Sequence, residues 1–210
     1  MDPARDRRDR RDRRDGTLAV VLGVVLFVSV ATLAIFFVVG DPFGTINDWT
    51  IGIAGLLTGL LLVVREGREQ VPAPAGGIAV ALGVLGAVLV VAGAGLVISG
   101  TTGFLLAGLV ETVGFALVGV WLLVFSAAQR RSPRWPRGLA TLGVVTGVVM
   151  ALGFVASPGV LAGFDDMNAA PWWIWVAFLA WLGIFVLFPI WSLWCGTTLR
   201  RVESSPVADA

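Results

Sequence analysis

The stretch GFLLAGLVETVGFALVGVWLLVFSAA, residues 103–128, decides the fold. It contains 26 residues, and Glu111 is the only charged residue among them. A helix needs about 17–25 mainly apolar residues to cross roughly 30 Å of hydrocarbon. The stretch is followed directly by QRRSPRWPR, residues 129–137, which contains four arginines. An apolar run of this length with a basic flank predicts a membrane-spanning helix.

Five more apolar runs of similar length lie on either side of it, in a chain that is 57% hydrophobic. The six predicted spans are residues 17–39, 46–64, 76–98, 103–128, 138–156 and 171–195. The loops between them reach only about a dozen residues, so we expect no inserted soluble domain. The sequence therefore predicts an all-α membrane protein, a six-transmembrane-helix bundle. Its single transmembrane domain covers residues 16–198, between an Arg/Asp-rich tail at 1–15 and a short tail at 199–210.

The basic residues occupy alternate loops. All 15 are arginines, and they lie before the first run and after the second, fourth and sixth runs. The other loops carry no basic residue, and two of them carry acids: Asp41 and Asp48, then Asp165 and Asp166. Arginine is enriched in short cytoplasmic loops. We therefore predict a multi-pass plasma-membrane protein with both termini in the cytoplasm, where the arginines face anionic lipid headgroups.

Missing residue types exclude several chemistries. The chain has no His and no Tyr, which excludes His-ligated haem, His-bearing zinc sites and a His general base. It has no Lys, which excludes a Schiff base. Cys195 is single, and we interpret it as a buried thiol, with palmitoylation as the alternative. Without a catalytic motif, we predict no catalytic residue, no cofactor and no metal site. A net charge of +1 gives no attraction for nucleic acid.

Small residues at every fourth position predict close helix packing within the chain. They occur in the second, third and fifth spans: Gly55 and Gly59; Ala75, Ala79, Gly83 and Ala87; Gly143, Gly147 and Ala151. The sixth span is rich in Trp and Phe, for which we expect mainly lipid contact. Within it, Trp181 lies deep enough that its indole N–H needs either a hydrogen-bond partner or a lipid-facing position with access to water. Pro189 predicts a kink near the arginine-bearing end of this span.

The loops and the first tail allow further expectations. Thr45 and Asp48 resemble a capping box that opens the second helix. Asp165 and Asp166 are expected to be solvated. The tract at residues 2–15 pairs Asp and Arg at i,i+4 spacing, so it favours a helix that extends the first span. We interpret it as a solvated anchor of the N-terminus, with docking to lipid or an acidic partner as the alternative.

Glu111 is the candidate functional residue. It lies about eight residues inside the fourth span, roughly 12 Å deep at 1.5 Å per residue. A carboxyl group at this depth is costly and is a functional hypothesis by default. Gly103 and Ala107 fall on the same stripe, so we expect Glu111 to face a neighbouring helix or a cavity. No basic residue lies at that depth, so we expect a neutral carboxyl that is hydrogen-bonded to a neighbour.

Two interpretations of Glu111 remain open. It is a helix clip, or it is a site for a proton or a cation; contact with a partner subunit is a third possibility. Four hydroxyl groups are expected at comparable depth as its partners: Ser29, Thr32, Thr58 and Thr146.

Two segments resemble a known group of proteins. DPFGTIND (residues 41–48) and FPIWSLWCGTTLRR (residues 188–201) are similar to segments of uncharacterised six-span integral membrane proteins of bacteria and archaea. The resemblance implies six spans and transfers no catalytic residue. Taken together, the sequence favours a non-enzymatic accessory or structural membrane subunit, bound to a membrane protein partner or to its own copy. The alternative is a small proton- or cation-coupled transporter or channel that uses Glu111, and a membrane enzyme is third.

Overall fold

The computed structural model describes residues 3–65, 75–132 and 135–201, and these residues form helices, turns and short loops without any strand. Six helical segments are long and apolar enough to cross a membrane, which confirms the all-α six-span bundle. The first four are α1 (Pro3–Val39), α2 (Phe43–Arg65), α3 (Ala75–Ile98) and α4 (Phe104–Gln129). The fifth joins α5 (Arg137–Ala151), the 3₁₀ segment η1 (Leu152–Ala156) and α6 (Ser157–Leu161). The sixth joins α7 (Ile174–Leu182), the π-helical segment η3 (Gly183–Leu187) and α8 (Phe188–Arg201), after the short 3₁₀ turn η2 (Met167–Ala169).

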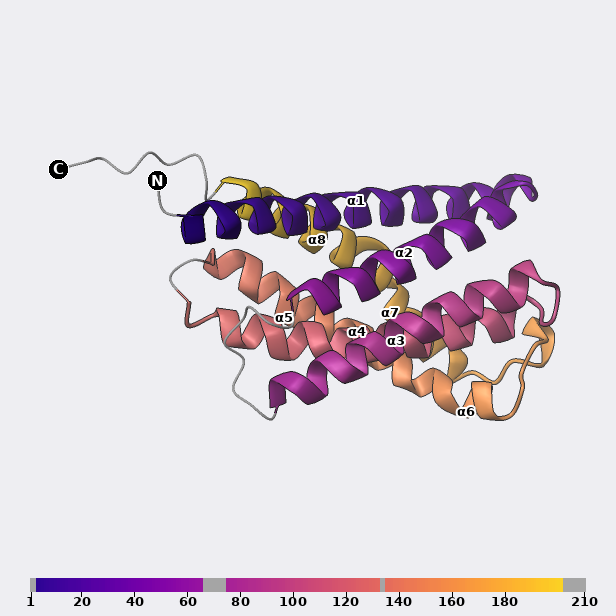
Figure 1. The fold of residues 1–210 in the computed structure, drawn as a ribbon. Helices are drawn as coiled ribbons and strands as arrows, with labels where there is room; N and C mark the ends of the chain where they lie inside the picture. Colours follow the sequence, from indigo (N-terminus) through magenta and orange to yellow (C-terminus); the bar gives the residue numbers. More distant parts are fainter. Residues whose placement is uncertain (1–2, 66–74, 133–134, 202–210) are drawn as a thin grey trace.

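The helices are arranged in a closed ring. Each long helix from α1 to α5 packs against the next one, α5 packs against α7 and α8, and α8 closes the ring against α1. The helix axes run roughly along one common direction (Figure 1). α4 is the most buried span, because it also contacts η1, α6 and α7.

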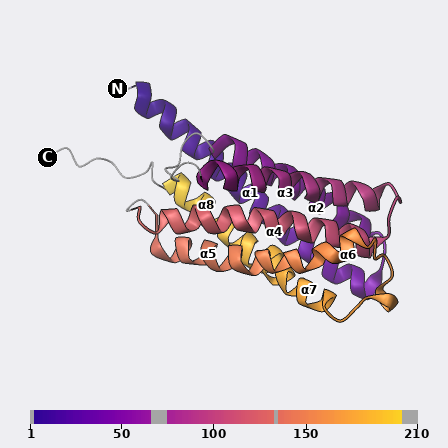
Figure 2. The same ribbon diagram turned by 90° about the horizontal axis from the view of Figure 1, so that it is seen from below.

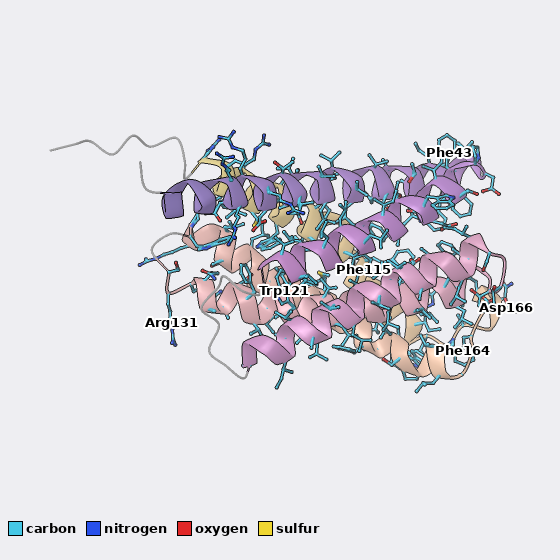
Figure 3. The ribbon with its side chains drawn as sticks, viewed as in Figure 1. Phe43, Phe115, Trp121, Arg131, Phe164 and Asp166 are labelled. Atoms are coloured by element: carbon cyan, nitrogen blue, oxygen red, sulfur yellow. The ribbon has the colours of Figure 1, made fainter. Side chains whose placement is uncertain are left out.

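The charged residues separate to the two ends of this bundle. The first turns of α1, the last turn of α8 and the connection from α4 to α5 lie together, and we call this the arginine end (Figure 1). Arg131 lies there, whereas Asp166 lies at the opposite end, which we call the acidic end (Figure 3). The first turns of α1 project beyond the other helices (Figure 2). The predicted helical extension is therefore confirmed from Pro3 onward, and the helix passes without a break through the predicted boundary at residue 15.

Glycine pairs fix three of the helix crossings. Gly86 of α3 faces Gly114 of α4, and a methyl group built on Gly114 would lie 2.7 Å from the carbonyl oxygen of Gly86. Gly119 of α4 and Gly147 of α5 meet in the same way. Gly16 of α1 meets Gly196 of α8, which closes the ring. In a lipid bilayer the hydrophobic effect does not drive helices together, so they associate through close backbone packing of this kind.

The predicted small-residue stripes pack within the chain, as expected. Gly55 lies against Val90, and Gly59 lies against Ala87. The closest approach between α3 and α4 was not predicted, because Gly86 belongs to a different stripe from Ala79, Gly83 and Ala87.

An aromatic cluster fills the bundle toward the arginine end. It consists of Trp121, Phe125, Trp135, Phe188 and Trp191. The rings of Trp121 and Phe125 stack with centroids 5.2 Å apart, and Trp191 meets both of them edge-on. Trp121 lies inside the bundle (Figure 3).

The expectation of lipid contact for the aromatic residues of the sixth span is therefore wrong for Phe188 and Trp191. Trp191 is 1% exposed and Phe188 is fully buried, because Gly143 of α5 leaves room for the indole. Trp172, Trp175 and Trp194 are exposed, as residues in contact with lipid would be. Cys195 is buried, as predicted.

Three element boundaries differ from the expectations. α2 begins at Phe43, so Thr45 and Asp48 lie inside the helix and the capping box is wrong. The fifth span continues to Leu161, because Pro158 lies in the first turn of α6, where proline needs no intrahelical donor. In the sixth span, the irregularity caused by Pro189 takes the form of the π-helical η3, one turn before the proline. The predicted short tail at residues 199–210 lies mostly outside the described residues.

Candidate functional site

Glu111 lies two turns into α4, at the interface with α3. A methyl group built on Gly93 of α3 would lie 2.6 Å from Cγ of Glu111 and 3.0 Å from the carbonyl oxygen of Ala107. Gly93 therefore provides the space that the stem of Glu111 occupies. Ala107 is buried beside it, so this part of the predicted stripe faces a neighbouring helix. Gly103, at the end of the stripe, faces Asp165 instead.

Glu111 also lines a small cavity. Its volume is about 20 Å³, and α1, α2, α4, α7 and η3 contribute to its walls. The polar side chains in the wall are Asn47, Glu111, Thr112 and Trp181. The apolar wall includes Leu33, Ile51, Phe115, Ile184 and Phe185. A water molecule needs a space of at least about 10–15 Å³ and two to four polar partners, so the cavity has the size and the lining for one water.

Asn47 is the polar side chain that α2 contributes to the cavity wall. It is 4% exposed, and its Oδ1 accepts a hydrogen bond of 2.8 Å from the Oγ–H of Ser29 on α1. This residue was missed at the sequence level, because it was assigned to a turn-rich loop. Its position in the first turns of an apolar span is the pattern that could have identified it, since buried amides need partners.

The expected hydroxyl partners of Glu111 form other bonds. Ser29 donates to Asn47, and three threonines donate to carbonyl oxygens of their own helices, which is the usual choice for a hydroxyl inside a helix. These are Thr32, Thr58 and Thr146. The prediction of these four partners is therefore wrong, and the hydroxyl next to Glu111 in the cavity wall is that of Thr112.

Thr112 connects α4 to α7. Its Oγ1 donates to the carbonyl oxygen of Gly108 at 2.6 Å and accepts the indole N–H of Trp181 at 3.1 Å. The expectation that Trp181 needs a partner is confirmed. Because Thr112 adjoins Glu111 in sequence, this bond ties the indole of the sixth span to the immediate surroundings of the carboxyl group.

The π-helical η3 forms another wall of the cavity through Ile184 and Phe185. One-turn π segments inside α-helices occur frequently at functional sites. Here the segment precedes Pro189, which cannot donate a backbone hydrogen bond to the turn before it. The helix is thus irregular at the level where it meets the cavity.

The charge environment of Glu111 is simple. α3, α7 and η3 contain no ionisable residue, and α4 contains none except Glu111. The carboxyl group of Asp48 on α2, which is half-buried, is close enough to repel a charge on Glu111. Among the residues that the structure describes, no group of three side chains is suited to hold a metal ion. The site thus offers one carboxyl group among the polar, uncharged side chains of the cavity wall, with a second carboxyl group, that of Asp48, nearby.

The two acids of the long loop at the acidic end have capping roles. The carboxylate of Asp165 accepts hydrogen bonds from the backbone N–H of Gly103 at 2.5 Å and of Leu106 at 3.1 Å. It therefore caps the N-terminus of α4, where the free N–H groups and the helix dipole favour a negative charge. Asp166 caps η2 by accepting from the N–H of Asn168. The expectation that both acids are only solvated is wrong. The partners of Asp165 lie far away in sequence, and Asp166 caps a short turn that the sequence does not reveal.

No protein-family model, curated protein or solved structure matches the chain. The resemblance to six-span proteins of bacteria and archaea stays a prediction.

Proposed function

We propose that this chain is a non-enzymatic accessory or structural subunit of a plasma-membrane complex. The observation that supports this role best is the small size of the cavity beside Glu111, about 20 Å³. Sites for small molecules usually have volumes of about 300–1,000 Å³. The glycine crossings bring the helix backbones into contact and leave little room for a solute path between them.

The arrangement of charges supports the orientation proposed for this role. The described arginines cluster at one end of the bundle, and Asp41, Asp165 and Asp166 lie at the other. By the positive-inside rule, the arginine end faces the cytoplasm and its anionic lipid headgroups. The chain then has both termini inside, and its partner is another membrane protein or a second copy.

Cysteine labelling tests the orientation. In a background in which Cys195 is replaced by Ser, Thr45→Cys at the acidic end should react with a membrane-impermeant maleimide applied to intact cells. Ser132→Cys at the arginine end should react only after the cells are permeabilised. Labelling of Ser132→Cys in intact cells would overturn the topology.

Reconstitution tests the accessory role. The purified chain in liposomes should show no saturable flux of protons, sodium or small solutes, and it should retain one or more membrane proteins when purified in mild detergent. A selective, saturable flux through the wild-type chain would overturn the accessory role.

A second candidate function is that of a small proton- or cation-coupled transporter. It is supported by one observation, the position of Glu111 at a polar cavity against an irregular helix. For this function, a flux in liposomes should disappear in Glu111→Gln while the variant keeps its thermal stability. A flux that survives in Glu111→Gln would exclude this role for Glu111.

A further inference from the structure

We infer that the cavity between α2, α4 and η3 is a reversible proton-binding site, in which Glu111 exchanges its proton with one water molecule held by Asn47 and Thr112. The site needs no solute flux, so it is compatible with the accessory role and is tested separately from it. Its ligand is a proton, and the water is the means by which the proton reaches the carboxyl group.

The first step of the argument is the hydrogen-bonding capacity of the wall. Thr112 donates to Gly108 and accepts from Trp181, which leaves one lone pair of its Oγ1 available. Asn47 uses its Oδ1 for Ser29 and also hydrogen-bonds Asp48 through its side chain, which leaves one of its two amide N–H donors available. Glu111 contributes a carboxyl group that donates when it is protonated and accepts when it is ionised. One water molecule in the cavity therefore has three polar partners in either protonation state.

The second step is the balance of the proton exchange. On release, the O–H bond of the Glu111 carboxyl group breaks, its electron pair stays on the carboxylate, and the water takes the proton. The remaining amide N–H of Asn47 is then the polar donor in the wall beside the negative charge, and no basic side chain lies among the described residues that line the cavity. On uptake, the same steps run in reverse.

The third step is the side from which the proton arrives. Asn47 belongs to the first turns of α2, and Phe104, which also lines the cavity, is the first residue of α4. Both places lie toward the acidic end of the bundle. Asp48, half-buried and adjacent to Asn47 in sequence, is the one other ionisable group among the described residues whose charge acts on Glu111. The proton therefore exchanges with the acidic end of the bundle.

The fourth step concerns what the protonation state changes. Trp181 bonds to Thr112 directly beside Glu111, and Ile184 and Phe185 of η3 form the wall next to it. A charge that appears on Glu111 reorients the water and changes the hydrogen bonding of Thr112. The local environment of Trp181 then reports the occupancy of the site.

Infrared difference spectroscopy tests this inference on the full chain in lipid nanodiscs. Stepping the pH in potassium buffer should reversibly remove and restore the carbonyl band of a protonated carboxyl group, and this band should shift in D₂O. Labelling glutamate with ¹³C at the carboxyl group should move the band, because Glu111 is the only glutamate inside a span. The band should be absent in Glu111→Gln and present in Asp48→Asn, and it should shift in Asn47→Leu but not in Thr58→Val.

Three results would overturn the inference. A band that does not change with pH would show a permanently protonated helix clip. The absence of any protonated-carboxyl band from the labelled wild-type chain would show an ionised group. A band that sodium removes at constant pH, while choline does not, would show a metal-cation site instead of a proton site. The wild-type measurement decides each case, whether or not a variant folds.

Discussion

The bundle is packed in two different ways along its length. Toward the arginine end, Trp121, Phe125 and Trp191 fill the interior with stacked and edge-on rings. Toward the acidic end, the same helix α4 presents Glu111 and Thr112 to a cavity with a polar wall. The difference shows that one helix, α4, can pack against aromatic rings in one half and leave room for a water molecule in the other. The change of packing coincides with η3, where the sixth span leaves α-helical geometry.

The largest expected effect lies in the aromatic half. Trp191→Ala removes a fully enclosed indole that contacts Trp121, Phe125 and Phe188, and we expect a loss of about 3–5 kcal/mol of unfolding free energy. The measurement is a denaturant titration in mixed micelles. Trp194→Ala is the matched control, because Trp194 is exposed and should cost less than about 1 kcal/mol. Equal losses for the two variants would contradict the aromatic core.

A smaller loss of stability is expected at the contact between α3 and Glu111 of α4. Gly93→Ala places a methyl group against the stem of Glu111 and should destabilise the bundle by about 1–3 kcal/mol. Gly95→Ala, two residues away, meets no atom within 4 Å and should be neutral or slightly stabilising. In a double-mutant cycle, Glu111→Ala should relieve part of the cost of Gly93→Ala. Additive effects would show that the two residues do not contact each other.

The carboxyl group itself gives the next effect. Glu111→Leu should cost about 0.6–2 kcal/mol, the size of interhelical hydrogen bonds in membranes. Glu111→Gln should keep the stability of the wild-type chain, because the amide still donates and accepts hydrogen bonds. The measurement is again the unfolding free energy in mixed micelles. A large loss in Glu111→Gln would mean that the negative charge, and not the hydrogen bonding, stabilises this half.

The smallest effect concerns the link between α4 and α7. Trp181→Phe keeps the aromatic ring and removes the N–H that donates to Thr112, so we expect a cost of about 0.6 kcal/mol. Thr112→Val should cost a similar amount, and the double variant should cost little more than either single one. Coupling energies near zero would show that the bond contributes nothing in the folded bundle.

The sequence was sufficient for the architecture and insufficient for the site. The thickness of the hydrocarbon core sets the length of the apolar runs, and the positive-inside rule sets which loops carry arginine. The six spans could therefore be predicted. The depth of Glu111 and the need of Trp181 for a partner followed from the same reasoning. Asn47 could have been recognised as a buried amide, but not as a neighbour of Glu111, because the start of α2 depends on tertiary packing and not on a cap.

Long-range partners were the second limit. Asp165 caps α4 from a loop about 60 residues away in sequence, and no local pattern reveals such a contact. Similarly, a stripe of small residues shows that a helix packs closely but not which of its faces makes the closest crossing. Gly86 and Gly93 lie on the face of α3 that meets α4, while Ala87 of the predicted stripe faces Gly59 of α2.

The crossing of Gly16 with Gly196 has a consequence for the order of assembly in the cell. The first and last spans of the chain are direct neighbours, so the ring cannot close until synthesis has reached α8. Until then, the face of α1 that carries Gly16 and Gly23 has no partner from its own chain. Insertion of a span into the bilayer and its association with other spans are separate stages. During biogenesis, this face of α1 therefore contacts lipid or another protein until α8 has been inserted.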